Sequence, residues 1–215
     1  MTRPAALLLA PLLAVALVAA ACGASGSSHP TPTPAPNITR PLDQIVLRVN
    51  DLPFGWATTP PYPRTYTVSN PPPGRQDGYQ SGFELPACTQ GGFRTQGWCT
   101  VIDTAIRFDS TATARVALQE AEDTLRKSGK VQFVAQPPRV GSDTFAYTVE
   151  RTQQLQGATL KVFEYHLNFR VANVLFEVFA TSPSVLGPPD QLAQWGDLIV
   201  KRTEGEGAAR AAPAR

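Results

Sequence analysis

The chain has 215 residues, of which 42% are hydrophobic, and its 19 Lys and Arg residues nearly balance its 17 Asp and Glu residues. This balance argues against a general electrostatic affinity for nucleic acid, so no nucleic-acid partner is expected. Residues 38–203 are enough for one globular domain of ordinary size, and we predict a single domain over that range.

The chain begins with a pattern typical of bacterial export. Arg3 precedes an apolar run over residues 5–21, and Cys22 follows that run directly. A charged start, an apolar middle and small residues before a cysteine are typical of an export signal that ends in a lipidation site. We therefore predict a signal peptide over residues 1–21 and a lipid anchor on Cys22. The mature protein would then be held on the bilayer, at the extracytoplasmic face of the cell membrane.

Two other interpretations of this segment stay open. Ala19, Ala20 and Ala21 also fit the small residues at which ordinary signal peptides are cleaved, and Ala19 stands where a lipidation signal usually has leucine. The third interpretation is an uncleaved membrane anchor. It is the least favoured, because the run is interrupted by Pro11 and a membrane span needs about 20 strongly apolar residues.

Both ends of the predicted domain are flanked by segments of biased composition. Residues 22–37 combine a Gly/Ser half with a half in which prolines alternate with other residues. The first half is flexible and the second favours extended polyproline conformations, so we predict a lipidated tether. Residues 204–215 are rich in Gly, Ala and Arg, and we predict a disordered tail there.

Two cysteines, Cys88 and Cys99, remain in the domain if Cys22 carries lipid. Exported proteins form disulfides, and an even number of remaining cysteines indicates a bridge. A metal site would need further ligands, and the only histidine of the domain, His166, lies far along the chain. We therefore predict a Cys88–Cys99 disulfide, no metal ion and no cofactor.

The first part of the domain combines a predicted helix with a long irregular region. Apolar residues recur with a helical period between Thr39 and Pro53, which predicts a helix there, and Trp56 would fold back onto it. Residues 58–97 are rich in Pro, Gly and Gln, with short strands expected at 65–68 and 80–85. Such a loop is often functional, although a covering loop without special function is the alternative. Its aromatic and basic side chains form our candidate binding surface: Tyr79, Phe93, Arg94 and Trp98.

The second part has the patterns of strands and helices in a regular order. A helix is predicted from the cap at Ser110 to Lys127, ended by Gly129, and another begins after Pro188. Runs of strands with a few helices predict an α+β domain, with an antiparallel β-sheet flanked by about three helices. The predicted strands are 100–108, 131–135, 145–152, 159–171 and 174–181.

The strand predicted at 159–171 alternates strictly between aromatic or aliphatic and polar residues. This pattern is typical of an antiparallel sheet with one covered face, so we expect His166 to face solvent with its polar neighbours. The apolar side consists of Phe163, Tyr165, Leu167 and Phe169, and the polar side of Glu164, His166, Asn168 and Arg170.

Short motifs resemble a group of exported actinobacterial lipoproteins. The segment from Asp51 to Trp56, DLPFGW, resembles their DLPxGW segment, and residues 169–174 resemble a hairpin that follows in the same proteins. Related lipoproteins and kinase sensor domains have antiparallel sheets flanked by helices, including the Mog1/PsbP-like fold. The resemblance implies a sensor-like domain in a non-enzymatic protein of the cell envelope, and it supplies no catalytic residue.

Three functional hypotheses follow. The first is a membrane-anchored lipoprotein that acts as a non-catalytic binding or sensor-like module toward an envelope protein or a lipid ligand. The second is a carrier of a lipid or another apolar molecule, suggested by the aromatic strand face with Phe176 and Phe179. The third is a hydrolase that would use Ser142, Asp143 and His166, although the G-x-S-x-G motif is absent. We predict the first, with no catalytic residue.

Overall fold

A computed structural model describes residues 36–67, 71–90, 97–155, 158–183 and 186–210. The predicted signal peptide, Cys22 and most of the predicted tether lie outside the described residues, as do Phe93 and Arg94.

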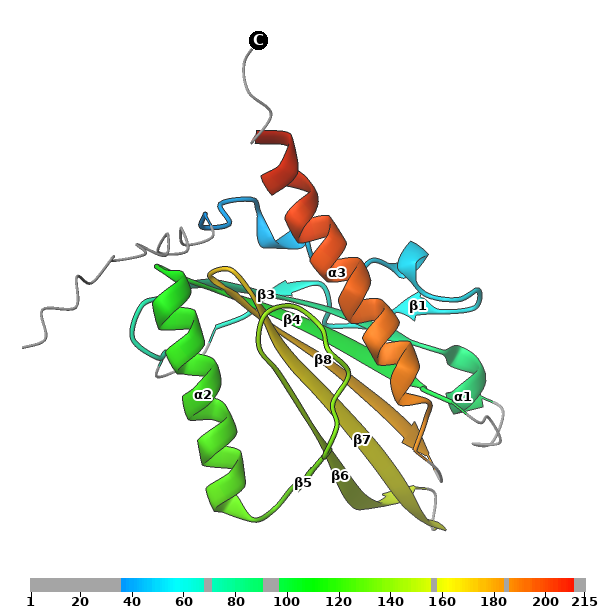
Figure 1. Cartoon of the computed structure of the whole chain (residues 1–215). Coiled ribbons are helices and arrows are strands. Elements are labelled where there is room, and N and C mark those ends of the chain that lie inside the picture. Colours follow the sequence, from blue (N-terminus) through cyan, green and yellow to red (C-terminus); the bar gives the residue numbers. More distant parts are fainter. Residues whose placement is uncertain (1–35, 68–70, 91–96, 156–157, 184–185, 211–215) are drawn as a thin grey trace, which may run out of the picture. The chain divides into compact units, whose positions relative to one another are not determined.

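The described residues form one antiparallel sheet flanked by helices (Figure 1). The strands follow the order β1-β3-β4-β8-β7-β6-β5, and β2 pairs with β3 beside this path. This arrangement confirms the predicted α+β fold class. The strands are β1 (Ala57–Thr58), β2 (Arg64–Thr65), β3 (Arg75–Glu84), β4 (Thr100–Phe108), β5 (Gln132–Phe133), β6 (Thr144–Leu155), β7 (Ala158–Val171) and β8 (Val174–Pro183).

Helix α2 (Thr111–Ser128) begins and ends where its sequence predicts. The Ser110 hydroxyl accepts a hydrogen bond from the Thr113 backbone N–H, and Gly129 adopts a left-handed conformation at the C-terminal end. The other helices are α1 (Pro86–Gln90), α3 (Pro189–Arg210) and two short 3-10 helices, η1 (Leu42–Gln44) and η2 (Val49–Asp51).

The helix predicted between Thr39 and Pro53 is wrong. The chain forms only η1 and η2 there, and Ile45, Val46 and Leu47 are all buried between them. A regular helix would not bury three consecutive side chains on one face. The Leu47 N–H donates instead to the Asp103 carboxylate, at 2.7 Å, so a tertiary contact replaces a helical one.

The predicted tail is also corrected in part. Helix α3 continues to Arg210, so residues 204–210 are helical, and residues 211–215 lie outside the described residues. Alanine, glutamate and arginine have high helix propensity, which offsets the two glycines of this segment.

The two faces of the sheet are covered by different elements. Apolar residues of β7 and β8 on one face pack against α3, and we call this the α3 face; it includes Tyr165, Leu167, Phe169, Phe176, Leu192, Trp195 and Ile199. On the opposite face, the α2 face, Leu118 packs with Phe145 and Tyr147 of β6. The expectation that the polar side of β7 faces solvent is therefore wrong for His166, whose side chain is only 13% exposed.

Candidate functional site

The structure does not support Trp98 as part of an accessible binding surface. Trp98 is buried, its Nε1 donates to the Pro188 carbonyl at 3.0 Å, and its ring packs edge-on against Tyr165. Tyr79 is half-buried on β3 and packs against the same core, and burial raises the pKa of its hydroxyl. Trp98 is thus a core residue of the α3 face, covered by Gly187 and Pro188, which lead into α3.

The predicted Cys88–Cys99 disulfide is confirmed. Its sulfur atoms lie 2.05 Å apart, and the bond ties α1 to the residue that precedes β4. Both cysteines are buried, and the Cys99 N–H donates to the Thr181 carbonyl at 2.7 Å. The bridge therefore fixes the start of β4 and closes the loop that it spans.

A cluster of titratable side chains lies on the α2 face, where strand register aligns β6, β7 and β8. Tyr147 and Phe179 are the register partners of His166, and their rings stack on the imidazole at 4.3 and 4.5 Å between centroids. The imidazole Nδ1 lies 2.8 Å from a Glu177 oxygen, and Nε2 lies 3.6 Å from a Glu164 oxygen. We call Tyr147, Glu164, His166, Glu177 and Phe179 the histidine cluster.

Electrostatics in this cluster favour a protonated imidazole. Burial alone would lower the pKa of His166, but the hydrogen bond to Glu177 and the negative charges of Glu164 and Glu177 outweigh it, so the pKa is raised. Burial, followed by the charges of the two glutamates, raises the pKa of Tyr147. Arg151 lies 3.0 Å from Glu164 and adds a second positive charge.

The arrangement around His166 does not form the triad of a hydrolase. Among the described residues, two carboxylates and two aromatic rings contact the imidazole, and no serine or cysteine does so. Asp143 forms an ion pair with Arg170 at 2.7 Å, four positions along β7 from His166, and Ser142 is exposed beside it. The three residues that the sequence suggested are therefore not brought together.

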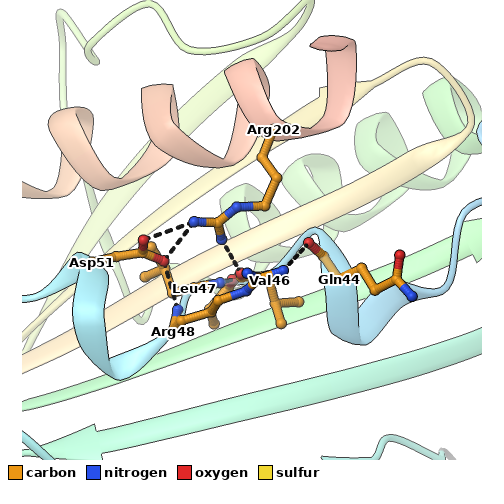
Figure 2. A network of polar contacts seen from close by, with 7 residues as sticks. Gln44, Val46, Leu47, Arg48, Asp51 and Arg202 are labelled. Carbon is orange, nitrogen blue, oxygen red and sulfur yellow. Dashed lines mark hydrogen bonds and ion pairs between the residues drawn. The ribbon is translucent and has the colours of Figure 1, made fainter. Parts of the chain in front are cut away.

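A second polar network joins α3 to the DLPFGW segment (Figure 2). Arg202 donates to both carboxylate oxygens of Asp51, at 2.7 and 2.9 Å, and to the Val46 carbonyl. The same Asp51 carboxylate accepts the Arg48 N–H at 2.7 Å. The carboxylate of Asp51 thus holds the N-terminal segment against α3.

Asp103 of β4, which contacts the same N-terminal segment at Leu47, is fully buried on the α3 face. One of its oxygens accepts the Leu47 N–H, and the other has no hydrogen-bond partner among the described residues. Burial raises the pKa of this carboxyl to about 7, against opposing contributions from the Leu47 hydrogen bond and the charge of Arg202. The sequence did not single out Asp103, Tyr147 or Glu177, because only strand pairing brings them to these positions.

The aromatic side of β7 is packed. Tyr165, Leu167 and Phe169 are buried under α3, and Phe169 stacks on Phe176 at 5.2 Å between ring centroids. Phe179, which the carrier hypothesis groups with these side chains, lies on the α2 face against His166. These side chains fill a core, which argues against the carrier hypothesis.

A groove of about 410 Å³ lies where the chain leaves α2 for β5. Its lining is mixed: Lys130 and Glu150 contribute charge, and Val131, Phe163 and Leu186 contribute apolar surface. Among the described residues, no three His, Cys, Asp or Glu side chains are placed to hold a metal ion. No helix of the described part of the chain is long and apolar enough to cross a membrane.

No family model and no curated protein matches the chain. The structure is similar to the extracellular domain of PknH from Mycobacterium tuberculosis, with a TM-score of 0.48, 12% identity, and coverage of 76% of this chain and 94% of that one. It is also similar to a protein from Bacteroides thetaiotaomicron, with a TM-score of 0.38, 13% identity, and coverage of 69% of this chain and 41% of that one. Both likenesses are too distant to carry a family or an activity.

Proposed function

We propose that this chain is a lipid-anchored lipoprotein of the extracytoplasmic membrane face and acts as a non-catalytic binding module in the cell envelope. The observation that carries the proposal is the Cys88–Cys99 disulfide inside the domain. Disulfides persist in oxidising compartments and are rare in the cytosol. The bridge therefore supports export, which the apolar run before Cys22 predicts independently.

The placement of the charged groups supports a non-catalytic role. His166 is held between two carboxylates and two rings, and Arg202 is held by Asp51 and a backbone carbonyl. A general acid or base must reach a substrate proton, and a nucleophile needs a base beside it. Neither requirement is met by these pairs, which stabilise contacts between strands and between α3 and the N-terminal segment.

The groove beside β5 is the binding surface that we propose for an envelope partner or a small ligand. Its volume, about 410 Å³, lies in the range of ligand pockets, and its lining combines apolar side chains with Lys130 and Glu150. Glu150 of this lining also forms an exposed ion pair with Lys161, at 2.6 Å.

Localisation in an actinobacterial host tests the proposal. We expect the wild-type protein to fractionate with membranes and to be digested by protease added to intact cells. The Cys22→Ser variant should instead be released into the medium, because its anchor cannot form. Ser25→Ala, which changes a neighbouring residue and keeps the thiol, is the matched control and should stay on the membrane. A Cys22→Ser protein that stays membrane-bound, or a wild-type protein protected inside the cell, would contradict the proposal.

A further inference from the structure

The outer edge of β6 is open over the second half of the strand. β6 has 12 residues, but β5 pairs only with Tyr147 and Thr148 (Figure 1). The Val134 N–H donates to the Ala146 carbonyl, so the even-numbered residues of β6 direct their backbone groups away from β7. Among the described residues, no backbone group pairs with this side of β6 beyond Thr148.

The opposite edge of the sheet is closed. There β1 and β2 both pair with β3, and after β1 the Thr59 N–H donates to the Gly82 carbonyl. Proline cannot donate a hydrogen bond to a further strand, and the covering segment contains Pro60, Pro61 and Pro63. The sequence of β6 contains no proline, and its pairing with β7 shows no bulge over its whole length. The edge of β6 thus lacks the usual protection against another strand.

The open groups of β6 are placed symmetrically about Thr152. The open stretch runs from Val149 to Leu155, and its outward N–H and C=O groups belong to Glu150, Thr152 and Gln154. Thr152 is the midpoint of this stretch. A two-fold axis through Thr152, perpendicular to the sheet, would place the same stretch of a second copy antiparallel to this one. Every outward group of the stretch would then gain a partner.

Charge favours this register over its neighbours. With the axis at Thr152, Arg151 lies opposite Gln153 of the second copy. Glu150 lies opposite Gln154 of that copy, so like charges do not face one another. An axis at Glu150 or Arg151 would set that residue against its own copy. An axis at Gln153 or Gln154 would carry the pairing past the end of β6 and leave the groups of Glu150 open.

A second copy also supplies its strand already extended. The open stretch is paired with β7 on its other side, and ion pairs across these two strands join Glu150 to Lys161 and Arg151 to Glu164. A disordered segment of another protein would have to be ordered on binding, which costs free energy. Because the two ion pairs balance the charges of Glu150 and Arg151 within each copy, little repulsion opposes the approach of two such edges.

We propose that two copies of this chain associate through the open edge of β6, in an antiparallel pair centred on Thr152. The pairing joins the two sheets into one continuous sheet across the axis. Because it uses main-chain groups and few side chains, the contact is weak between free chains and stronger where copies share one surface. The inference goes beyond the proposed function and does not depend on the anchor at Cys22.

Thr152→Pro tests the proposal, because the N–H at this position points away from β7 and proline is tolerated where a strand's N–H faces solvent. The mature chain with Cys22→Ser is used, so that no lipid is present. In sedimentation equilibrium from micromolar to submillimolar concentrations, we expect this chain to form reversible dimers. Thr152→Pro should weaken the association by about tenfold or more. Thr152→Ala keeps the N–H and is the matched control, so it should associate like the parent chain.

Amide hydrogen exchange followed by NMR needs no variant, so it stays decisive if Thr152→Pro fails to fold. The N–H groups of Glu150 and Thr152 should exchange more slowly at concentrations where the dimer is populated. The Arg151 N–H, which faces β7, should exchange slowly at every concentration.

Three results would overturn the proposal. The first is a chain that stays monomeric over the whole concentration range. The second is a dimer that a folded Thr152→Pro variant leaves unchanged, and the third is a dimer that does not slow exchange at Thr152. Edge amides that are protected in a monomer by an added extended peptide would instead assign the edge to a strand of another protein.

Discussion

On the α2 face of the sheet the imidazole of His166 lies between two carboxylates, whereas on the α3 face the carboxylate of Asp103 has a single hydrogen-bond donor. Both groups are buried, yet burial acts differently on them. Burial disfavours the charged form of His166, but Glu164 and Glu177 outweigh it, and the pKa of the imidazole is raised. Burial also disfavours the charged form of Asp103, and there it outweighs the opposing contributions, so the pKa of the carboxyl is raised as well. The comparison shows that partners, more than depth, decide whether a buried group is charged.

The two groups also act on stability in adjoining pH ranges. The raised pKa of His166 contributes stability that is complete below its unfolded pKa, near 6.5, and is lost as the pH rises through the folded value. The pKa of Asp103 rises from 3.8 to about 7, so its carboxyl destabilises the fold increasingly as the pH rises through that range. Both effects make the protein less stable in alkali than in mild acid.

The largest effect is expected from His166→Leu. The change leaves Glu177 without its partner, whereas Glu164 keeps Arg151, so it should cost about 3 kcal/mol of the free energy of unfolding. Urea unfolding at pH 6 measures this value. Asn168→Ala, at the next polar position of β7, is the control and should cost far less. A loss below about 1 kcal/mol for His166→Leu would show that the cluster does not hold the strands together.

Arg202→Met should have the next largest effect. The side chain binds Asp51 and the Val46 carbonyl, so its loss should cost about 2 kcal/mol. The charge of Arg202 lowers the pKa of Asp103, so the variant should raise that pKa further. The loss of stability caused by ionisation of Asp103 should then extend to higher pH. Lys201→Met removes the neighbouring exposed charge and should leave both quantities unchanged. An unchanged free energy of unfolding for Arg202→Met would show that its contacts with Asp51 and Val46 do not stabilise the fold.

Asp103→Asn should stabilise the protein. The amide oxygen can still accept the Leu47 N–H, and the variant avoids a buried negative charge. We expect the free energy of unfolding to rise by about 2 kcal/mol at pH 8. This gain is smaller than the raised pKa of Asp103 alone implies, because the new amide nitrogen would be buried without a hydrogen-bond acceptor. The gain should vanish near pH 4, where the carboxyl is neutral in the folded state. A loss of stability at pH 8 would mean that the ionised carboxylate has a partner.

The smallest effect on stability is expected from Phe54→Ser. The ring is fully exposed, so the free energy of unfolding should change by less than about 0.5 kcal/mol. Thermal and urea unfolding of the variant check this directly. A clearly larger loss would mean that Phe54 packs inside the domain.

Local signals allowed much of the fold to be predicted. The Ser110 cap and Gly129 set the limits of α2, and the alternation of β7 with the turn at Ala172 set the β7–β8 hairpin. The segment between Thr39 and Pro53 was predicted wrongly, because its Leu47 N–H is satisfied by Asp103, far along the chain. A helical period does not reveal such a contact.

The site was less predictable than the fold. The histidine cluster depends on the registers of β6, β7 and β8 and on the cover by α2, neither of which is encoded in one strand. The alternation of β7 predicted the face on which His166 lies, but it wrongly predicted that this face is open to solvent. Trp98 looked like a loop aromatic, yet the fold around the disulfide returns it to the core.

Intact-mass analysis of the full-length protein, purified in mild detergent from an actinobacterial host, tests the central claim most directly. We predict a chain that begins at Cys22, carries a diacylglyceryl group, and lacks the two hydrogens removed by the Cys88–Cys99 bond. An unmodified chain, whether it begins at Cys22 or keeps residues 1–21, would contradict the lipid anchor and the membrane location proposed with it.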